Sequence, residues 1–298
     1  MKSRNEKRHE IVYTVLFCLF AVVFLLGFWI IAYHVFSAFR STALNDELQK
    51  QFFESSLITS QNADADLTSE DQSRQEASAE NPGSAGQEAK GEKQHRQLSL
   101  DFKELKSSYP DTAAWLTLEA LRINYPVMHT DNNSFYIDHL YNGEPNSYGA
   151  LFVDYRNRGD FSDQNTVIYG HHMGDGSMFG SLEDYRSQEF YDLYPTMMLY
   201  TPEGDYRIEF ISGTSEDGDY EFVEFNFNSE EAFLDYVQDL RSRSCFTSDV
   251  EVHPGDRLVS LCTCAYKREN ERFMLVGKLV ELYTEENGPG NETAQADN

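Results

Sequence analysis

The sequence predicts a mainly β domain, folded as a closed or nearly closed barrel of eight short strands with a few peripheral helices and preceded by one transmembrane helix. Three observations predict this. An uncharged apolar run lies near the N-terminus, a long polar stretch follows, and eight β-like runs then share the chain with only two or three helical segments. A doubly wound α/β sheet would require more helices between its strands. Many short strands with few helices are typical of a barrel.

The apolar run covers residues 11–33 and contains no formal charge. At about 1.5 Å per residue, a helix of this length extends about 35 Å, enough to cross a bilayer. Four basic residues precede the run, namely Lys2, Arg4, Lys7 and Arg8. Only Arg40 and Lys50 follow it closely. The positive-inside rule therefore places residues 1–10 in the cytoplasm, an anchor at residues 11–36 and the rest of the chain outside the cell. A signal peptide cleaved near residues 41–43 is the alternative, but its apolar region would span only about 7–15 residues.

Residues 37–59 form a juxtamembrane segment in which Leu44, Leu48 and Phe52 recur every four residues. This spacing predicts that the helix continues beyond the bilayer, although the sequence does not identify what it packs against. Residues 60–97 are rich in Gln, Glu, Asp, Ser, Ala and Gly and lack aromatic residues, which predicts a disordered linker able to hold a domain off the membrane. The folded domain then covers residues 98–284, and residues 285–298 form a disordered tail.

The β-like runs show alternation, or enrichment in β-branched and aromatic residues, that is typical of strands. They cover residues 115–118, 123–128, 150–155, 166–170, 197–201, 206–214, 257–264 and 272–282. Residues 98–107 and 230–243 are predicted to be helical. In the second segment the apolar residues recur at helical spacing, at Phe233, Leu234, Val237 and Leu240.

Composition excludes one class of partner and one class of scaffold. The chain has 24 Lys and Arg against 50 Asp and Glu, a net charge of −26. Nucleic acid is therefore not expected as a partner, because phosphate binding needs a basic surface. The four cysteines are too few and too unevenly spaced for a disulfide scaffold.

Two segments carry residues suited to chemistry. His171 and His172 follow the strand predicted at residues 166–170, and Cys262 and Cys264 end the strand predicted at residues 257–264. Alternation places Cys262 and Cys264 on one face of that strand. If residues 265–271 form a hairpin connection, Arg272 begins the neighbouring antiparallel strand close to Cys264.

A thiol, an imidazole and a guanidinium suit acyl transfer. The thiolate attacks an amide carbonyl, the imidazole moves the proton, and the cation stabilises the oxyanion. On spacing alone, the same residues fit equally a semi-buried cysteine, a loop histidine and a surface arginine. A zinc site built from these histidines and cysteines is disfavoured, because the histidines are adjacent and Cys-x-Cys lacks the usual spacer.

The motifs together resolve the choice. From about residue 98 to residue 281 the chain resembles the class B sortases. The resemblance rests on Tyr-Gly-His-His-Met at residues 169–173 with Ser-Met-Phe at 177–179, and on Ser-Leu-Cys-Thr-Cys at 260–264 followed by Arg-Phe at 272–273. It also rests on Ile-Asn-Tyr-Pro-Val at 123–127, on Leu-Phe-Val-Asp-Tyr-Arg-Asn at 151–157 and on the helical segment before the cysteine strand.

The resemblance implies an eight-stranded sortase barrel that acts outside a Gram-positive cell. Such an enzyme cleaves a secreted surface protein at a C-terminal sorting motif, Asn-Pro-x-Thr or a related signal. It joins the new carboxyl end to an amine of the peptidoglycan cross-bridge precursor. Carried over, Cys264 is the nucleophile that forms a thioacyl intermediate, His171 the general acid and base, and Arg272 the group that stabilises the oxyanion. No metal or organic cofactor is implied.

Some questions stay open at this point. The family usually has a small hydroxyl residue where this chain has Cys262, and we expect Cys262, His172 and Thr263 to line the substrate groove without doing chemistry. Asp160 and Asp163 are candidates to orient His171, but no third member is assigned. The acceptor could instead be a pilin lysine, and a catalytically silent surface binding module is the alternative from another functional class.

Overall fold

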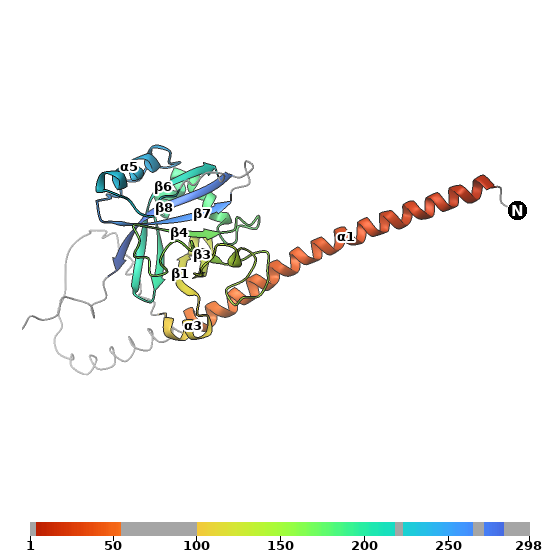
Figure 1. Cartoon of the computed structure of the whole chain (residues 1–298), viewed down its shortest axis with the longest axis horizontal. Helices are drawn as coiled ribbons and strands as arrows, with labels where there is room; N and C mark the ends of the chain where they lie inside the picture. Colours follow the sequence, from red (N-terminus) through yellow and green to blue (C-terminus); the bar gives the residue numbers. More distant parts are fainter. Residues whose placement is uncertain (1–3, 55–99, 218–222, 265–270, 283–298) are drawn as a thin grey trace, which may run out of the picture.

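The computed structural model describes residues 4–54, 100–217, 223–264 and 271–282. Within these residues, eight strands close into a barrel in the order β1-β2-β3-β4-β7-β8-β6-β5, which confirms the predicted architecture (Figure 1). The β2–β3 and β4–β7 pairs are parallel and the other pairs antiparallel. The strands are β1 (Thr112–Leu118), β2 (Ile123–Met128), β3 (Leu151–Val153), β4 (Asn165–Gly170), β5 (Thr196–Thr201), β6 (Gly204–Asp217), β7 (Arg257–Cys264) and β8 (Glu271–Leu282).

Each strand lies where the sequence predicts one, and the largest difference is in β6. This strand continues to Asp217, three residues beyond the predicted end. The reason is its partner on one side: β8 pairs with β6 as far as Asp217, past the point where β5 ends. Tertiary pairing therefore lengthens a strand whose own alternation ends earlier.

Several helices surround the barrel. They are α1 (Arg4–Gln49) with a π-helical turn η1 (Lys50–Glu54), α3 (Phe102–Ser108), α4 (Gln188–Leu193), α5 (Glu230–Ser242) and the 3₁₀ turns η2 (Glu119–Leu121), η3 (Phe135–Ile137) and η4 (Gly180–Arg186). The predicted helices at residues 98–107 and 230–243 correspond to α3 and α5. The short α4 and the 3₁₀ turns were not predicted, because elements this short show little periodicity.

The two faces of β7 and β8 pack into different clusters. Val259 and Leu261 lie in the barrel interior, whereas Cys262 packs with Met274 in a second cluster beneath α5. The predicted alternation along residues 257–264 is therefore present. Helix α5 covers this outer face: Phe233, Val237 and Leu240 are buried, while Leu234 stays 38% exposed.

The end of α1 packs against the barrel, which identifies the partner of the juxtamembrane segment. Leu44, Leu48 and Phe52 are buried in a third cluster that contains Leu105 of α3 and Trp115 of β1. The C-terminal part of α1 is therefore docked on the barrel and is continuous with the apolar N-terminal part of the same helix. Residues 60–97 and 285–298 lie outside the described part of the chain.

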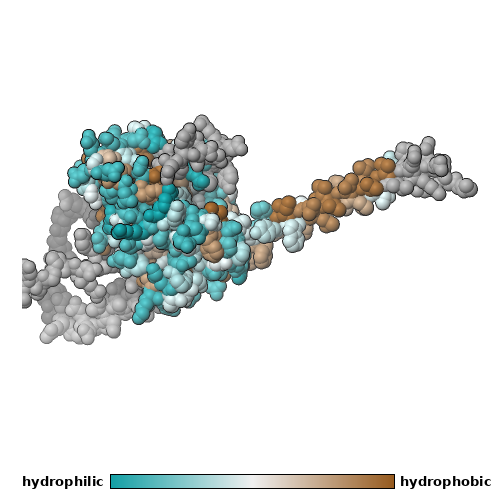
Figure 2. All heavy atoms as spheres, viewed as in Figure 1, coloured by the Kyte–Doolittle hydropathy of each residue, from teal (hydrophilic) through white to brown (hydrophobic). Residues whose placement is uncertain are grey.

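The part of α1 before Ser37 is different. Among its described residues, the large apolar side chains from Val12 to Phe36 are exposed. Figures 1 and 2 show this part running away from the barrel as an apolar rod. The helix is long and apolar enough to cross a membrane.

Candidate active site

The three residues predicted to carry the chemistry come from three adjacent strands. Gly170 at the end of β4 is in register with Thr263 of β7, so His171 and Cys264 are the next residues of two neighbouring parallel strands. Cys264 also pairs directly with Arg272 of β8. Neighbouring strands lie about 4.8 Å apart. The backbone thus brings His171, Cys264 and Arg272 to one end of the barrel; the side chain of Cys264 lies outside the described part.

The two residues before His171, Tyr169 and Gly170, are held in place by their surroundings. The Tyr169 hydroxyl donates to Asp154 over 3.1 Å, and Asp154 is fully buried. Burial and the nearby Cys262 and Asp154 raise the pKa of Tyr169, so its hydroxyl remains a donor. A Cβ at Gly170 would lie 2.5 Å from the Leu151 side chain, so only glycine fits there.

The buried Asp154 remains a carboxylate. Burial alone would raise its pKa, but hydrogen bonds from Arg156 and Asn133 hold the pKa below its usual value. This acceptor therefore holds Tyr169, and with it the end of β4, in place.

The imidazole of His171 is oriented by a backbone carbonyl, a group that the sequence did not suggest. Its Nε2 lies 2.6 Å from the carbonyl oxygen of Ile137 in η3. A carbonyl can only accept, so Nε2 carries a proton and Nδ1 is the nitrogen left for proton transfer. Every residue has a carbonyl, so no sequence pattern marks this one. The two carboxylates considered as orienting groups form local hydrogen bonds instead. Asp163 accepts a hydrogen bond from the Asn157 side chain, and Asp160 accepts one from the Ser162 backbone N–H.

His172 contacts residues of the segment that follows it in the chain. It forms an antiparallel bridge with Met178, and its Nε2 is 3.9 Å from Glu183. Glu183 in turn lies 3.6 Å from Arg186, which is 3.3 Å from Glu271. His172 therefore belongs to a charged cluster at the start of β8, and its contact with substrate stays a prediction.

Cys262 and Thr263 are buried, with exposed fractions of 0% and 1%. Cys262 packs in the apolar cluster beneath α5, and the Thr263 hydroxyl has no hydrogen-bond partner among the described residues. Burial weighs against contact with a peptide, so their place in the groove also stays a prediction. The described residues contain no group of three or more His, Cys, Asp or Glu side chains that could hold a metal ion.

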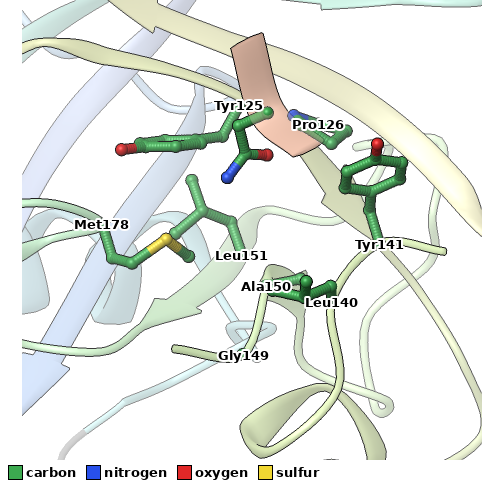
Figure 3. A pocket seen from close by; sticks show the side chains of 9 residues that line it. Tyr125, Pro126, Leu140, Tyr141, Gly149, Ala150, Leu151 and Met178 are labelled. Carbon is green, nitrogen blue, oxygen red and sulfur yellow. The ribbon is translucent and has the colours of Figure 1, made fainter. Parts of the chain in front are cut away.

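A small crevice lies between α1 and the barrel, close to the loop that carries His171 and His172. Figure 3 shows Met178 and Tyr141 on opposite sides of it, with Leu151 between them. Asn45 of α1 completes the wall. Because Met178 bridges to His172, the crevice connects α1 with the loop that carries His171.

The chain is similar to proteins of known family. The model of the sortase domain matches residues 116–280. Sortase B of Listeria monocytogenes is 35% identical over 182 residues, which cover 60% of this chain and 74% of that protein. Sortase B of Staphylococcus aureus is 28% identical over 192 residues, or 64% of this chain and 79% of that protein.

Solved structures agree. A complex of S. aureus sortase B with substrate superposes with a TM-score of 0.58 at 29% identity, covering 61% of this chain and 85% of that one. Sortase B of Bacillus anthracis in complex with AAEK2 superposes with a TM-score of 0.57 at 31% identity, over 61% and 83% of the two chains. The barrel, the strand register and these relatives lead to one conclusion: the chain belongs to the sortase family, in class B, the cysteine transpeptidases that attach surface proteins.

Proposed function

We propose that this enzyme cleaves a C-terminal sorting signal of secreted proteins and joins the new carboxyl end to an amine of the peptidoglycan cross-bridge precursor. The observation that carries the proposal is the shared end of β4, β7 and β8, where His171, Cys264 and Arg272 meet. The complex of S. aureus sortase B with its substrate supports a peptide substrate. The net charge of −26 disfavours nucleic acid as a partner.

In the first half-reaction the Cys264 thiolate attacks the scissile carbonyl. The carbon–sulfur bond forms, and the carbonyl electrons move onto the oxygen beside Arg272, whose cation stabilises the oxyanion. As the tetrahedral intermediate collapses, the carbon–nitrogen bond breaks and His171 gives its Nδ1 proton to the leaving amine. A thioacyl-enzyme and the C-terminal fragment result.

In the second half-reaction the acceptor amine attacks the thioester. Neutral His171 takes a proton from that amine at Nδ1, the carbon–sulfur bond breaks, and the thiolate of Cys264 is regenerated. The Ile137 carbonyl suits both steps, because it binds the Nε2 proton whether Nδ1 is protonated or not.

Incubation of the enzyme with a library of sorting-signal peptides tests this proposal. We expect cleavage within a Pro-x-Thr type signal, a thioester adduct on Cys264 by mass spectrometry, and a ligated product when a cross-bridge amine is added. A peptide bearing a free lysine side chain serves as the competing acceptor. Exclusive transfer to that lysine would contradict the cell-wall acceptor, and the absence of any adduct would contradict the mechanism.

We further propose that residues 11–36 anchor the enzyme in the membrane, with the N-terminus in the cytoplasm and the barrel outside. The uncharged run, the exposed apolar side chains of α1 and the preceding basic residues support this. Cleavage at residues 41–43 is disfavoured, because Ser37 and Arg40 before that point and Leu44 after it all contact the barrel. Ser37, the first residue after the anchor, already binds the barrel, so the domain sits directly at the membrane surface.

Protease added to intact protoplasts tests this topology. The barrel should be digested while a fragment containing residues 11–36 stays with the membrane. A secreted mature protein that begins near residue 44 would show that the segment is a cleaved signal peptide.

A further inference from the structure

Residues 138–149, which make up the connection from η3 to β3 except for Ala150, are held by the docked end of α1; we call them the clasp loop. Ser37 Oγ donates to Asn146 Oδ1 over 2.6 Å, and Asn146 Nδ2 donates back to the Ser37 carbonyl over 3.0 Å. Arg40 donates from Nε and Nη2 to the two carboxylate oxygens of Glu144, each over 2.9 Å. A bidentate bond of this kind fixes direction as well as distance.

A second set of contacts lies one to two turns further along α1. The Tyr141 hydroxyl donates to the carbonyl of Leu44 over 3.0 Å, and burial raises the pKa of Tyr141, so the donor keeps its proton. Leu140 and Tyr141 are buried in the same cluster as Leu44 and Leu48. Polar and apolar contacts together fasten the clasp loop to α1.

The other side of the clasp loop reaches the active site. Ile137, which accepts the hydrogen bond from His171, is the residue directly before the loop. Near the loop's far end, the Tyr148 hydroxyl donates over 2.9 Å to Asp175, four residues after His171. Both ends of the clasp loop therefore touch the segment that carries the imidazole.

Gly149, the last residue of the clasp loop, sets the position of the Ile137 carbonyl. Its φ is +59°, and a Cβ there would lie 2.6 Å from the Ile137 oxygen and 2.5 Å from the Tyr136 oxygen. Real Cβ atoms do not approach oxygens so closely, so any side chain at 149 would displace the carbonyl that His171 uses. Gly143 in the same loop also has a positive φ, +80°, but open space around it.

We infer that the docked segment of α1, residues 37–48, positions the imidazole of His171 through the clasp loop, with the Ile137 carbonyl as the positioning group. The inference rests on the proposed function, in which His171 transfers the proton. Release of α1 would free the clasp loop, move the Ile137 carbonyl and allow the imidazole to turn. Full activity then requires the anchor helix to be docked, and not merely present in the same chain.

Gly149→Ala and Gly143→Ala, made in the full chain in detergent, form a matched pair. Both place alanine at a positive φ, but only Gly149→Ala pushes on the carbonyl. We expect kcat to fall between about tenfold and a hundredfold for Gly149→Ala, as for a misplacement of about 1 Å, with KM within about twofold. Gly143→Ala should keep kcat within about twofold of the parent. Equal kcat values for the two variants would overturn the inference.

A milder pair acts at the α1 contact and keeps the fold. Tyr141→Phe removes only the oxygen that binds Leu44, whereas Tyr194→Phe alters a hydroxyl near α4. In enzyme labelled with ¹⁵N-histidine, Tyr141→Phe should shift the Nε2 resonance of His171 and lower kcat about threefold at constant KM. Tyr194→Phe should do neither. An unchanged resonance and an unchanged kcat in Tyr141→Phe would overturn the inference even if Gly149→Ala failed to fold.

His171→Ala separates this inference from the proposed function. If His171→Ala loses activity while Gly149→Ala and Tyr141→Phe keep it, the proposed function stands and the positioning role of α1 is wrong. If His171→Ala itself keeps full activity, the proposed role of His171 is wrong, and the inference falls with it.

Discussion

Replacement of Cys264 by alanine should abolish cleavage of a sorting peptide and formation of the thioacyl adduct. Cys264 is the cysteine at the end of β7, in register with Arg272 and one residue beyond the Thr263–Gly170 pair. Cys262, the thiol two residues away, is fully buried and is therefore no substitute. A nucleophile that splits the reaction into two steps cannot be replaced by water bound at the same place without a large loss of rate. Steady-state cleavage and intact-mass analysis would measure both effects.

Cys262→Ser is the matched control for that variant. The hydroxyl would sit in the apolar cluster beneath α5, so we expect a loss of stability of about 1–3 kcal/mol. The rate should nevertheless stay within about tenfold, a barrier change of about 1.4 kcal/mol. An adduct mapped to Cys262, or full activity in Cys264→Ala, would refute the assignment of the nucleophile.

Arg272→Lys should lower kcat/KM on the order of a hundredfold, although it keeps the positive charge. Arg272 pairs with Cys264 across the β7–β8 ladder and with Glu216 across the β6–β8 ladder, so its backbone is held on both sides. Lysine would lose the planar set of donors that can bind an oxyanion and a neighbouring carbonyl at the same time. The measurement is kcat/KM for a sorting peptide.

Arg122→Lys is the control for the loss of a guanidinium, because Arg122 is exposed between η2 and β2. It should leave kcat/KM within about twofold. A loss below about fivefold in Arg272→Lys would mean that the charge alone suffices and that the donor geometry of arginine is not used.

The barrel and the apolar helix could be predicted from local patterns, namely alternation with period two and an uncharged run at residues 11–33. The candidate residues His171, Cys264 and Arg272 could be named only from the resemblance to the class B sortases, because their spacing alone fits an inert arrangement equally well. The pairing of Cys264 with Arg272 was also predictable, because a short connection between antiparallel strands leaves few registers.

The relation between α1 and the candidate active site could not be predicted from the sequence. Leu44, Leu48 and Phe52 form an apolar stripe that the sequence reveals, but the partners of this stripe in α3 and β1 lie far away in the sequence. Cys262 packs in the apolar cluster beneath α5, a contact that the sequence of β7 alone does not reveal. The Ile137 carbonyl that holds His171 has no sequence signature at all. These features depend on which distant segments come into contact, and a period read along one segment carries no information about the surface it will meet.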